Sequence, residues 1–144
     1  MQLPSINVEF RKHVADIEAM LLTMPQVDCP LQHDFVDGVY CRTITIPAGT
    51  LGTGMIHNNA CRSVLLQGKM VVWSEAQGRL EVEAPCIWDS PAGTKRLFAI
   101  EEEVVWMTVH KAESVTVPEV EAELYSITYE QYDARLGYNI EGEL

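Results

Sequence analysis

The chain has 144 residues, a mass of 16.2 kDa, 47% hydrophobic residues and 22% charged residues, a balance typical of one folded domain and not of a disordered chain. Its formal net charge of −11 excludes a protein that coats nucleic acid, because phosphates require a basic face. The uninterrupted apolar runs are short, such as residues 70–73, and the first residues lack a signal-peptide pattern. We therefore expect neither a membrane span nor export.

The four cysteines form no CxxC pair and lie far apart in the sequence: Cys29, Cys41, Cys61 and Cys86. Nothing else in the chain indicates export, so we expect reduced thiols in a cytoplasmic protein. Acidic residues are absent between Asp37 and Glu75 and gather after Ile100. The middle of the chain is therefore slightly basic, and the C-terminal part is strongly acidic.

The first predicted element is a helix over residues 5–24. Either Ser5 or Asn7 can cap it, and Pro25 ends it. Its apolar face repeats at alternating spacings of four and three residues: Phe10, Val14, Ile17, Leu21 and Met24. Residues 26–38 contain Pro30 and end in Asp37 and Gly38, which predicts a loop.

Short strand-like runs follow at close spacing, separated by turn residues. They cover residues 39–46, 53–57, 62–67, 69–74, 79–84, 94–100 and 104–110. Many short strands with regular turns favour an all-β sandwich or barrel over alternating strands and helices.

The acidic C-terminal tail returns to a helical pattern. Pro118 begins a short helix that ends near Leu124, and Thr128 caps a second one that ends at Gly137. The tail carries enough apolar side chains to dock on the barrel or on a partner subunit. We therefore expect one domain, consisting of a helix over residues 5–24, a barrel over residues 39–111 and a helical tail over residues 118–144.

The stretch from Gly49 to Gly68, followed by Pro91 and Gly93, resembles the two motifs of the cupin superfamily. The first family motif has a Gly, then His-x-His, a Glu four or five residues later and a closing Gly. The second has Pro-x-Gly with a His three residues after that Gly. The resemblance implies an all-β jelly-roll barrel. The chain also resembles small cupin-like proteins encoded by bacteriophages, which implies the host cytoplasm as its location.

The family's metal-ligand positions fall on Met55, His57, Cys61 and Arg96. Only His57 is a family ligand, and Arg96 is a permanent cation that repels a metal. We therefore expect no cofactor. If the barrel does hold a metal, Met55, His57 and Cys61 form a soft ligand set that suits copper(I) or zinc, with His57 and Cys61 as the first candidates. The other interpretation makes Met55 and Cys61 ordinary core residues.

Arg96 is the most informative candidate. Inside the barrel, it can bind a carboxylate or phosphate in place of the metal; if the alignment is off by one residue, it lies in solvent. Strand alternation places Lys95 on the opposite face. Arg62 faces outward in a regular strand, and a bulge or a place at the barrel mouth would turn it inward. His57 is either a polar anchor or base for a ligand, or a hydrogen-bonded structural residue.

The last predicted strand has two different faces. Trp106, Thr108 and His110 form a polar and aromatic face that could line a pocket, whereas the opposite face consists of Val105, Met107 and Val109. The purely apolar face makes the simpler core, so we favour it slightly as the inward one. The three residues of the polar face stay in the candidate site.

Three functions follow from these features. The leading hypothesis is a non-catalytic cupin-fold protein that binds a small anionic ligand, with Arg96 and His57 as anchors. The bacteriophage resemblance makes a host nucleotide-type signal one such ligand. The first alternative is a metal-dependent enzyme with a remodelled site that includes His110. The second is a structural jelly roll whose helices build a homodimer or attach the protein to a larger assembly.

Overall fold

The computed structural model describes residues 7–137. Helix α1 spans Val8–Leu21 and begins where Asn7 Oδ1 accepts a hydrogen bond from the Phe10 amide at 2.9 Å. The predicted helix is therefore confirmed over Val8–Leu21, with Asn7 as its cap, and it ends three residues before the predicted end at Met24. Residues 5 and 6 of the prediction lie outside the described part of the chain. Within residues 7–137 no helix is both long and apolar enough to span a bilayer.

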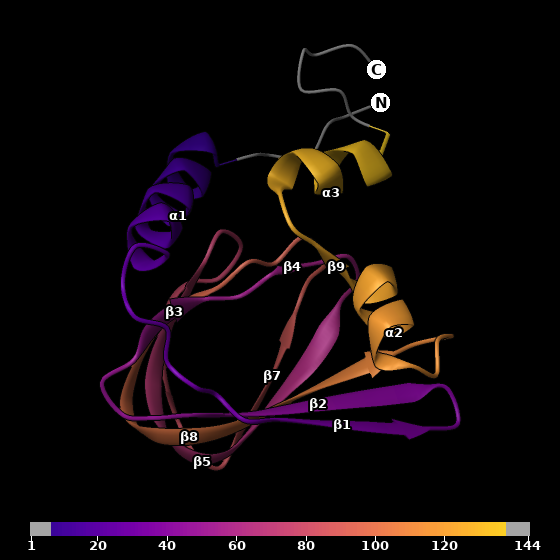
Figure 1. Cartoon of the computed structure of the whole chain (residues 1–144), viewed down its shortest axis with the longest axis horizontal. Helices are drawn as coiled ribbons and strands as arrows, with labels where there is room; N and C mark the ends of the chain where they lie inside the picture. The colour runs from indigo at the N-terminus through magenta and orange to yellow at the C-terminus, as the bar shows by residue number, and fades with distance from the viewer. Residues whose placement is uncertain (1–6, 138–144) are drawn as a thin grey trace.

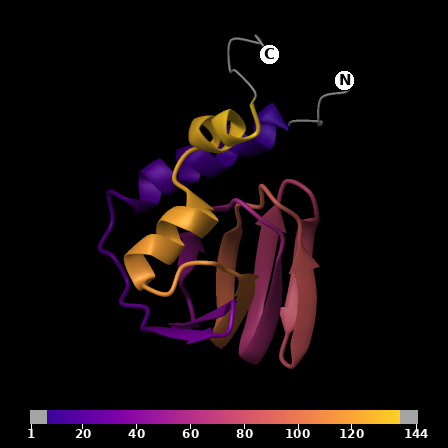
Figure 2. The same ribbon diagram turned by 90° about the vertical axis from the view of Figure 1, so that its right-hand side faces the viewer.

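The strands form a curled antiparallel sheet that the helices cover on one side (Figures 1 and 2). The main path runs β1-β2-β8-β5-β6, with β3 paired to β8 and β7 paired to β5, and β4 pairs with β9 in a second, small sheet. The strands are β1 Leu31–Val36, β2 Val39–Ile46, β3 Leu51–Thr53, β4 Ile56–His57, β5 Cys61–Ser74, β6 Gly78–Glu83, β7 Cys86–Ser90, β8 Leu97–Lys111 and β9 Tyr125–Ser126.

The prediction of a loop over residues 26–38 is wrong for its second half. Strand β1 pairs with β2 along its whole length, and the two strands join at Asp37 and Gly38, both at positive φ. Such a two-residue turn matches the twist of a hairpin. Strand β7 lies where the sequence predicted no strand. The sequence prediction missed β1 because this strand carries many polar residues, which an edge strand tolerates since its outer face lies in water.

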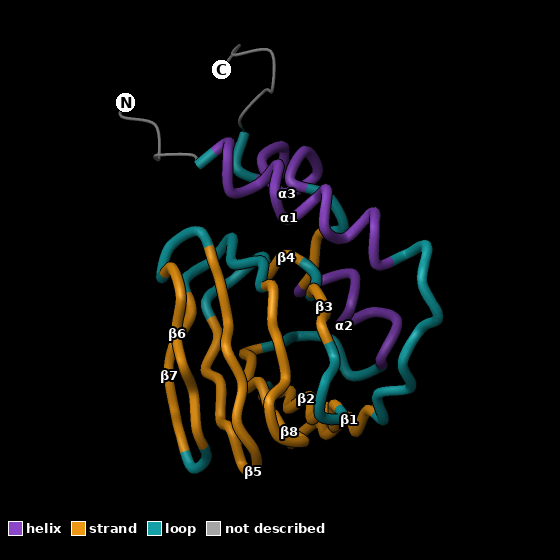
Figure 3. The backbone as a smooth tube through the Cα atoms, turned by 90° about the vertical axis from the view of Figure 1, so that its left-hand side faces the viewer, coloured by secondary structure: helices purple, strands orange, loops and turns teal. Residues whose placement is uncertain are grey.

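Two pairs of predicted strands are in fact single long strands. Residues 62–67 and 69–74 belong to β5, and residues 94–100 and 104–110 contribute to β8. The expected turn at Gly68 is a bulged segment between Leu65 and Met70 where β5 shifts register against β8. A bulge bends a strand without ending its pairing, so β5 and β8 run side by side through the middle of the sheet (Figure 3).

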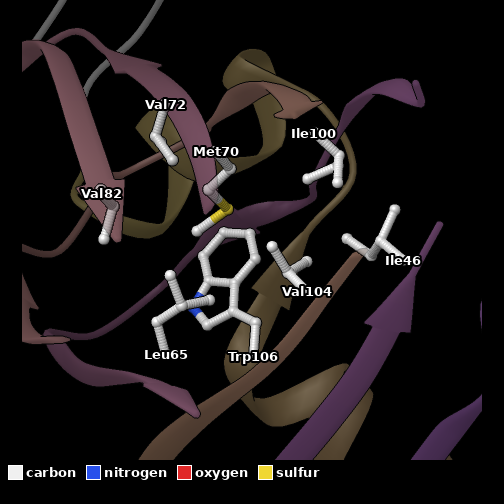
Figure 4. Packing of buried hydrophobic residues seen from close by; sticks show 8 residues of the cluster. All are labelled: Ile46, Leu65, Met70, Val72, Val82, Ile100, Val104 and Trp106. Atoms are coloured by element: carbon white, nitrogen blue, oxygen red, sulfur yellow. The ribbon is translucent and has the colours of Figure 1, made fainter. Parts of the chain in front are cut away.

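Two apolar clusters form the core of the barrel and hold α2 against it. The larger one fills the closed part of the barrel (Figure 4) and consists of Ile46, Leu65, Met70, Val72, Val82, Ile100, Val104 and Trp106. In the smaller one, Val120 and Leu124 of α2 (Val117–Leu124) pack on Tyr40 of β2. This part of the tail therefore docks on the chain's own barrel.

The predicted second tail helix is α3, which spans Tyr129–Arg135. The Thr128 hydroxyl accepts from the Gln131 amide at 3.1 Å, and Gly137 adopts a φ of 83° just after the helix. Both end signals are confirmed; residues 138–144 of the predicted tail lie outside the described part of the chain. Ion pairs join α1 to the rest of the fold, since Arg11 contacts Asp133 at 2.9 Å and Glu75 at 3.3 Å.

The bulge of β5 makes Gly68 hard to replace. Gly68 has a φ of 92°, and a Cβ there would lie 2.0 Å from the carbonyl oxygen of Glu103. Gly78 also has a positive φ of 64°, but nothing lies within 4 Å of its Cβ position. Gly68→Ala should therefore lower the free energy of unfolding by at least about 2 kcal/mol more than Gly78→Ala, which carries only backbone strain. Urea unfolding of both variants measures the difference, and equal costs would contradict the close approach.

Candidate functional site

The interior of the barrel changes from polar to apolar along the strands. On β2 the inward side chains are Tyr40, Arg42, Ile44 and Ile46, and these pair across β8 with His110, Thr108, Trp106 and Val104, in that order. On β5, Ser63 lies opposite Thr108 and Leu65 lies opposite Trp106. Because directly paired residues share a face, the interior has polar layers at one end and apolar layers at the other. The boundary runs between Thr108 and Trp106.

This arrangement corrects the predicted orientation of the last strand. Trp106, Thr108 and His110 are 5%, 7% and 3% exposed and face inward, so the preference for an inward Val105, Met107 and Val109 is wrong. The apolar face is nevertheless half-buried. Thr108 and His110 tolerate burial because they find partners inside the barrel, such as the 2.9 Å contact between His110 Nε2 and Thr108 Oγ1.

Arg96 lies inside the barrel, 5% exposed, which confirms the inward placement and rules out the solvent-exposed alternative. Its Nη2 donates to Ser90 Oγ at 2.9 Å and to Ser63 Oγ at 3.3 Å, and its Cζ lies 5.0 Å from the centre of the Trp106 ring. Within residues 7–137 it forms no ion pair with a carboxylate. Burial lowers the pKa of Arg96, but the guanidinium stays charged at neutral pH.

His57 connects Arg96 to Cys61. Arg96 Nη1 lies 3.4 Å from His57 Nε2, and His57 Nδ1 lies 3.1 Å from Cys61 Sγ. Because a guanidinium only donates, Nε2 is the acceptor, and the neutral ring carries its proton on Nδ1 toward the sulfur. Burial, followed by the charge of Arg96, holds the pKa of His57 well below 6.5. Burial raises the pKa of the Cys61 thiol, against the opposing effect of Arg96.

His110 joins this cluster from β8. Its ring centre lies 5.5 Å from that of His57, and the hydroxyl of Tyr125 lies 3.5 Å from its Nε2. Burial, followed by the charges of Arg96 and Arg42, lowers the pKa of His110 to about 4. Both imidazoles are therefore neutral at pH 7. The ligand atoms of His57, Cys61 and His110 all lie within 4.8 Å of one another.

Arg42 is a second inward cation, which the sequence prediction missed. Its Cζ lies 6.0 Å from the centre of the Tyr125 ring, and its buried Nε has no hydrogen-bond partner. Among residues 7–137 no carboxylate pairs with it. The alternation of side chains along β2 could have predicted this orientation. Arg42 is two residues from Tyr40 and four from Ile46, so it shares a face with these two buried residues.

A cavity of about 220 Å³ lies between these groups and α1. Its walls come from both layers of the barrel and from the α1 side: Glu18, Arg42, Ile44, Ile46, Thr53, Gly54, Met55, Arg96, Phe98, Trp106, Thr108 and Tyr125. Glu18 belongs to α1 and accepts from the Lys95 ammonium at 2.9 Å and from the Thr53 hydroxyl. Lys95 therefore contacts Glu18 and not the partners of Arg96. Both residues are buried and precede β8, which begins at Leu97, so the predicted strand alternation does not apply to them.

Arg62 does not reach the site. Its side chain is 61% exposed and its Nε lies 2.7 Å from Asp89 Oδ1 on the outer face of the sheet. The bulges of β5 lie beyond Leu65, too far along the strand to turn Arg62 inward. The suggestion that a bulge brings Arg62 into the barrel is wrong. All four cysteines are free thiols, as predicted.

Comparisons with known proteins establish the fold. No protein-family model matches the sequence, and no curated protein matches it. Among solved structures, a cupin superfamily protein from Desulfitobacterium hafniense is similar with a TM-score of 0.51 and 12% identity, over 66% of this chain and 87% of that chain.

Two further structures give the same result. The DMSP lyase DddQ from Ruegeria pomeroyi has a TM-score of 0.52 and 11% identity over 62% of this chain and 49% of its own. The cupin domain of Cnp3 from Schizosaccharomyces pombe has a TM-score of 0.50 and 18% identity over 62% and 66%. At such identities the likeness shows the fold alone. The chain therefore has the cupin fold, a jelly-roll barrel with an N-terminal helix and short C-terminal helices, as the sequence analysis predicted.

Acidification should destabilise the fold through the buried histidines. His110 has a folded-state pKa of about 4 against an ordinary value of 6.5, so the unfolded chain binds more protons as the pH falls below 6.5. Stability is full above that pH and decreases toward pH 4, by roughly 3 kcal/mol for this residue. His57 adds a loss of the same sign.

Urea unfolding at pH 7, 6, 5 and 4 measures this loss. His110→Gln should flatten the dependence, whereas His13→Gln on the exposed side of α1 should leave it unchanged. An identical dependence in the wild type and in His110→Gln would show that His110 is not held neutral by its surroundings.

Proposed function

We propose that this cupin-fold chain binds a small organic anion inside the barrel, between Arg42 and Arg96. The observation that carries the proposal is the pair of inward guanidiniums that line one cavity without a carboxylate partner among residues 7–137. Arg96 is buried, as is the Nε atom of the half-buried Arg42, and a buried charge is costly unless it is paired. An anion from solution is the partner that this cavity lacks.

The other titratable groups near the cavity do not supply the missing negative charge. His57 and His110 are neutral at pH 7 and contribute no charge. The one acidic residue that lines the cavity, Glu18, is already matched by Lys95 at 2.9 Å. The two arginines therefore determine the sign of the field in the cavity, although the whole chain carries a net charge of −11.

The size of the cavity bears on which anion enters. At about 220 Å³ it is smaller than the roughly 300–1,000 Å³ of sites for drug-sized ligands. This volume supports a ligand smaller than a nucleotide. The nucleotide-type signal that the bacteriophage resemblance implies is therefore a comparison compound in the test.

Calorimetry with benzoate and adenosine monophosphate tests the proposal. Benzoate should bind the wild-type protein, and Arg42→Met should weaken binding about ten- to a hundredfold, because a charge-assisted hydrogen bond is lost. Arg62→Met is the matched control, since Arg62 lies outside the barrel, and it should bind as the wild type does. Thermal unfolding of each variant confirms the fold. Absence of binding for both compounds, or equal weakening in the two variants, would overturn the proposal.

A second candidate function is supported by the cluster of His57, Cys61 and His110. Two neutral imidazoles and one thiolate are a donor set for a soft ion. Binding would require loss of the Cys61 proton and transfer of the His57 proton away from Nδ1, the nitrogen that faces the sulfur. Arg96 decides between ions, because its Nη2 lies 3.7 Å from Cys61 Sγ. Copper(I) with a thiolate has no net charge beside the guanidinium, whereas zinc with a thiolate keeps one positive charge. The donors therefore fit copper(I) better than zinc, and a bound copper ion would supply one-electron redox chemistry.

Metal titration under reducing conditions tests this candidate. The wild-type protein should take up one equivalent of copper(I) in competition with a copper(I) chelator and should hold zinc less tightly. Cys61→Ser should lose this uptake, whereas Cys86→Ser, which removes a thiol outside the cluster, should keep it. Uptake that is absent from the wild type, or unaffected by Cys61→Ser, would exclude a metal at this cluster.

A further inference from the structure

We infer that the anion is an amphipathic monocarboxylate, with a carboxylate head beside Arg42 and an unbranched apolar body directed toward Ile46. This inference rests on the proposed anion binding and specifies its ligand class. It comes from the way the cavity crosses the boundary between the polar and apolar layers of the barrel.

The lining changes its chemistry in one direction. The first layer of the cavity is Arg42 beside Thr108, the second is Ile44 beside Trp106, and Ile46 follows two residues further along β2. The four residue steps along β2 from Arg42 to Ile46 cover about 13 Å. This length matches a head group and a chain of roughly six to ten carbon atoms. A ligand in this cavity therefore meets cations at one end and hydrocarbon at the other.

The apolar end is rigid and preformed. Trp106 and Phe98 meet edge to face, with ring centres 5.9 Å apart, and Ile46 is 1% exposed in the main core. Phe98 lies over Gly52 of β3, where a Cβ would be 2.7 Å from its ring. Close packing on both sides holds these walls in place, so a ligand body gains apolar burial without ordering the protein first.

The polar end offers few free donors. The terminal nitrogens of Arg96 already form hydrogen bonds with His57, Ser63 and Ser90. This residue therefore contributes positive charge but no pair of free N–H donors for a carboxylate. The Thr108 hydroxyl is already hydrogen-bonded to His110 Nε2, with 2.9 Å between the two atoms, so it is engaged within the protein. The unengaged fork is that of Arg42, whose Nε is buried without a partner. One planar fork matches one carboxylate and leaves phosphate oxygens without donors.

Calorimetric titration of straight-chain carboxylates from acetate to decanoate tests the ligand class. Affinity should rise about fourfold for each buried methylene group and stop rising once the chain passes Ile46. Octanamide, which keeps the body and loses the charge, should bind at least about tenfold more weakly than octanoate. Inorganic phosphate and adenosine monophosphate should bind more weakly than octanoate.

Two variants locate the body of the ligand. Ile44→Phe places a ring in the second layer of the cavity and should shift the best chain to a shorter length while acetate binding persists. Ile87→Phe adds the same ring on the outer face, where Ile87 is 65% exposed, and should leave the chain-length profile unchanged.

The outcomes separate the two levels of the proposal. If acetate and octanoate bind equally, or if phosphate binds better than octanoate, the monocarboxylate class is wrong and anion binding stands. If Ile44→Phe leaves the profile of the wild type unchanged, the body does not lie along β2. If no carboxylate, phosphate or nucleotide binds, both the ligand class and the proposed function fall.

Discussion

The polar half of this barrel depends on one buried cation held by neutral partners. Arg96 lies inside the barrel, 5% exposed, and it contacts two serine hydroxyls and an imidazole. Because a guanidinium can only donate, it determines which nitrogen of His57 is unprotonated and directs the other toward Cys61. Its charge, added to the effect of burial, also keeps His57 and His110 neutral. One buried guanidinium thus determines the protonation state of the whole layer.

The boundary between the polar and apolar layers follows from strand geometry. Side chains alternate with a period of two, and directly paired residues of β2, β8 and β5 share a face. The register places Arg42, Thr108 and Ser63 in one row and Ile44, Trp106 and Leu65 in the next. A one-residue slip of β2 would place Cys41 and Thr43 inside and remove a cation from the cavity. The same register that builds the core therefore builds the candidate site.

Much of the fold was predictable from local signals, and the exceptions have physical causes. The caps at Asn7 and Thr128 and the bounds of β2 follow from residue chemistry that acts within a few positions. Strand β1 was missed because an edge strand shows little burial pattern. The inward face of β8 was misjudged because the apolar Val105 and Met107 gain partial burial from neighbours that only the tertiary structure supplies. Arg96 was found through the motif, whereas Arg42 belongs to no motif and required the pairing of β2 with β8.

The two functional candidates, anion binding and metal binding, are not independent, because the charges of Arg42 and Arg96 affect both. Arg42 and Arg96 both depress the pKa of His57 and His110, so an anion that screens these arginines would raise the pKa of both imidazoles and favour proton uptake. The same anion would reduce the repulsion that a cation meets at His57, Cys61 and His110. A carboxylate in the cavity and a soft cation in the cluster would therefore stabilise each other, because each removes the charge that opposes the other. The fold thus places two arginines that would bind an anion beside three residues that could bind a cation. Arg96 is one of the two arginines and also contacts His57 and Cys61 of the cluster.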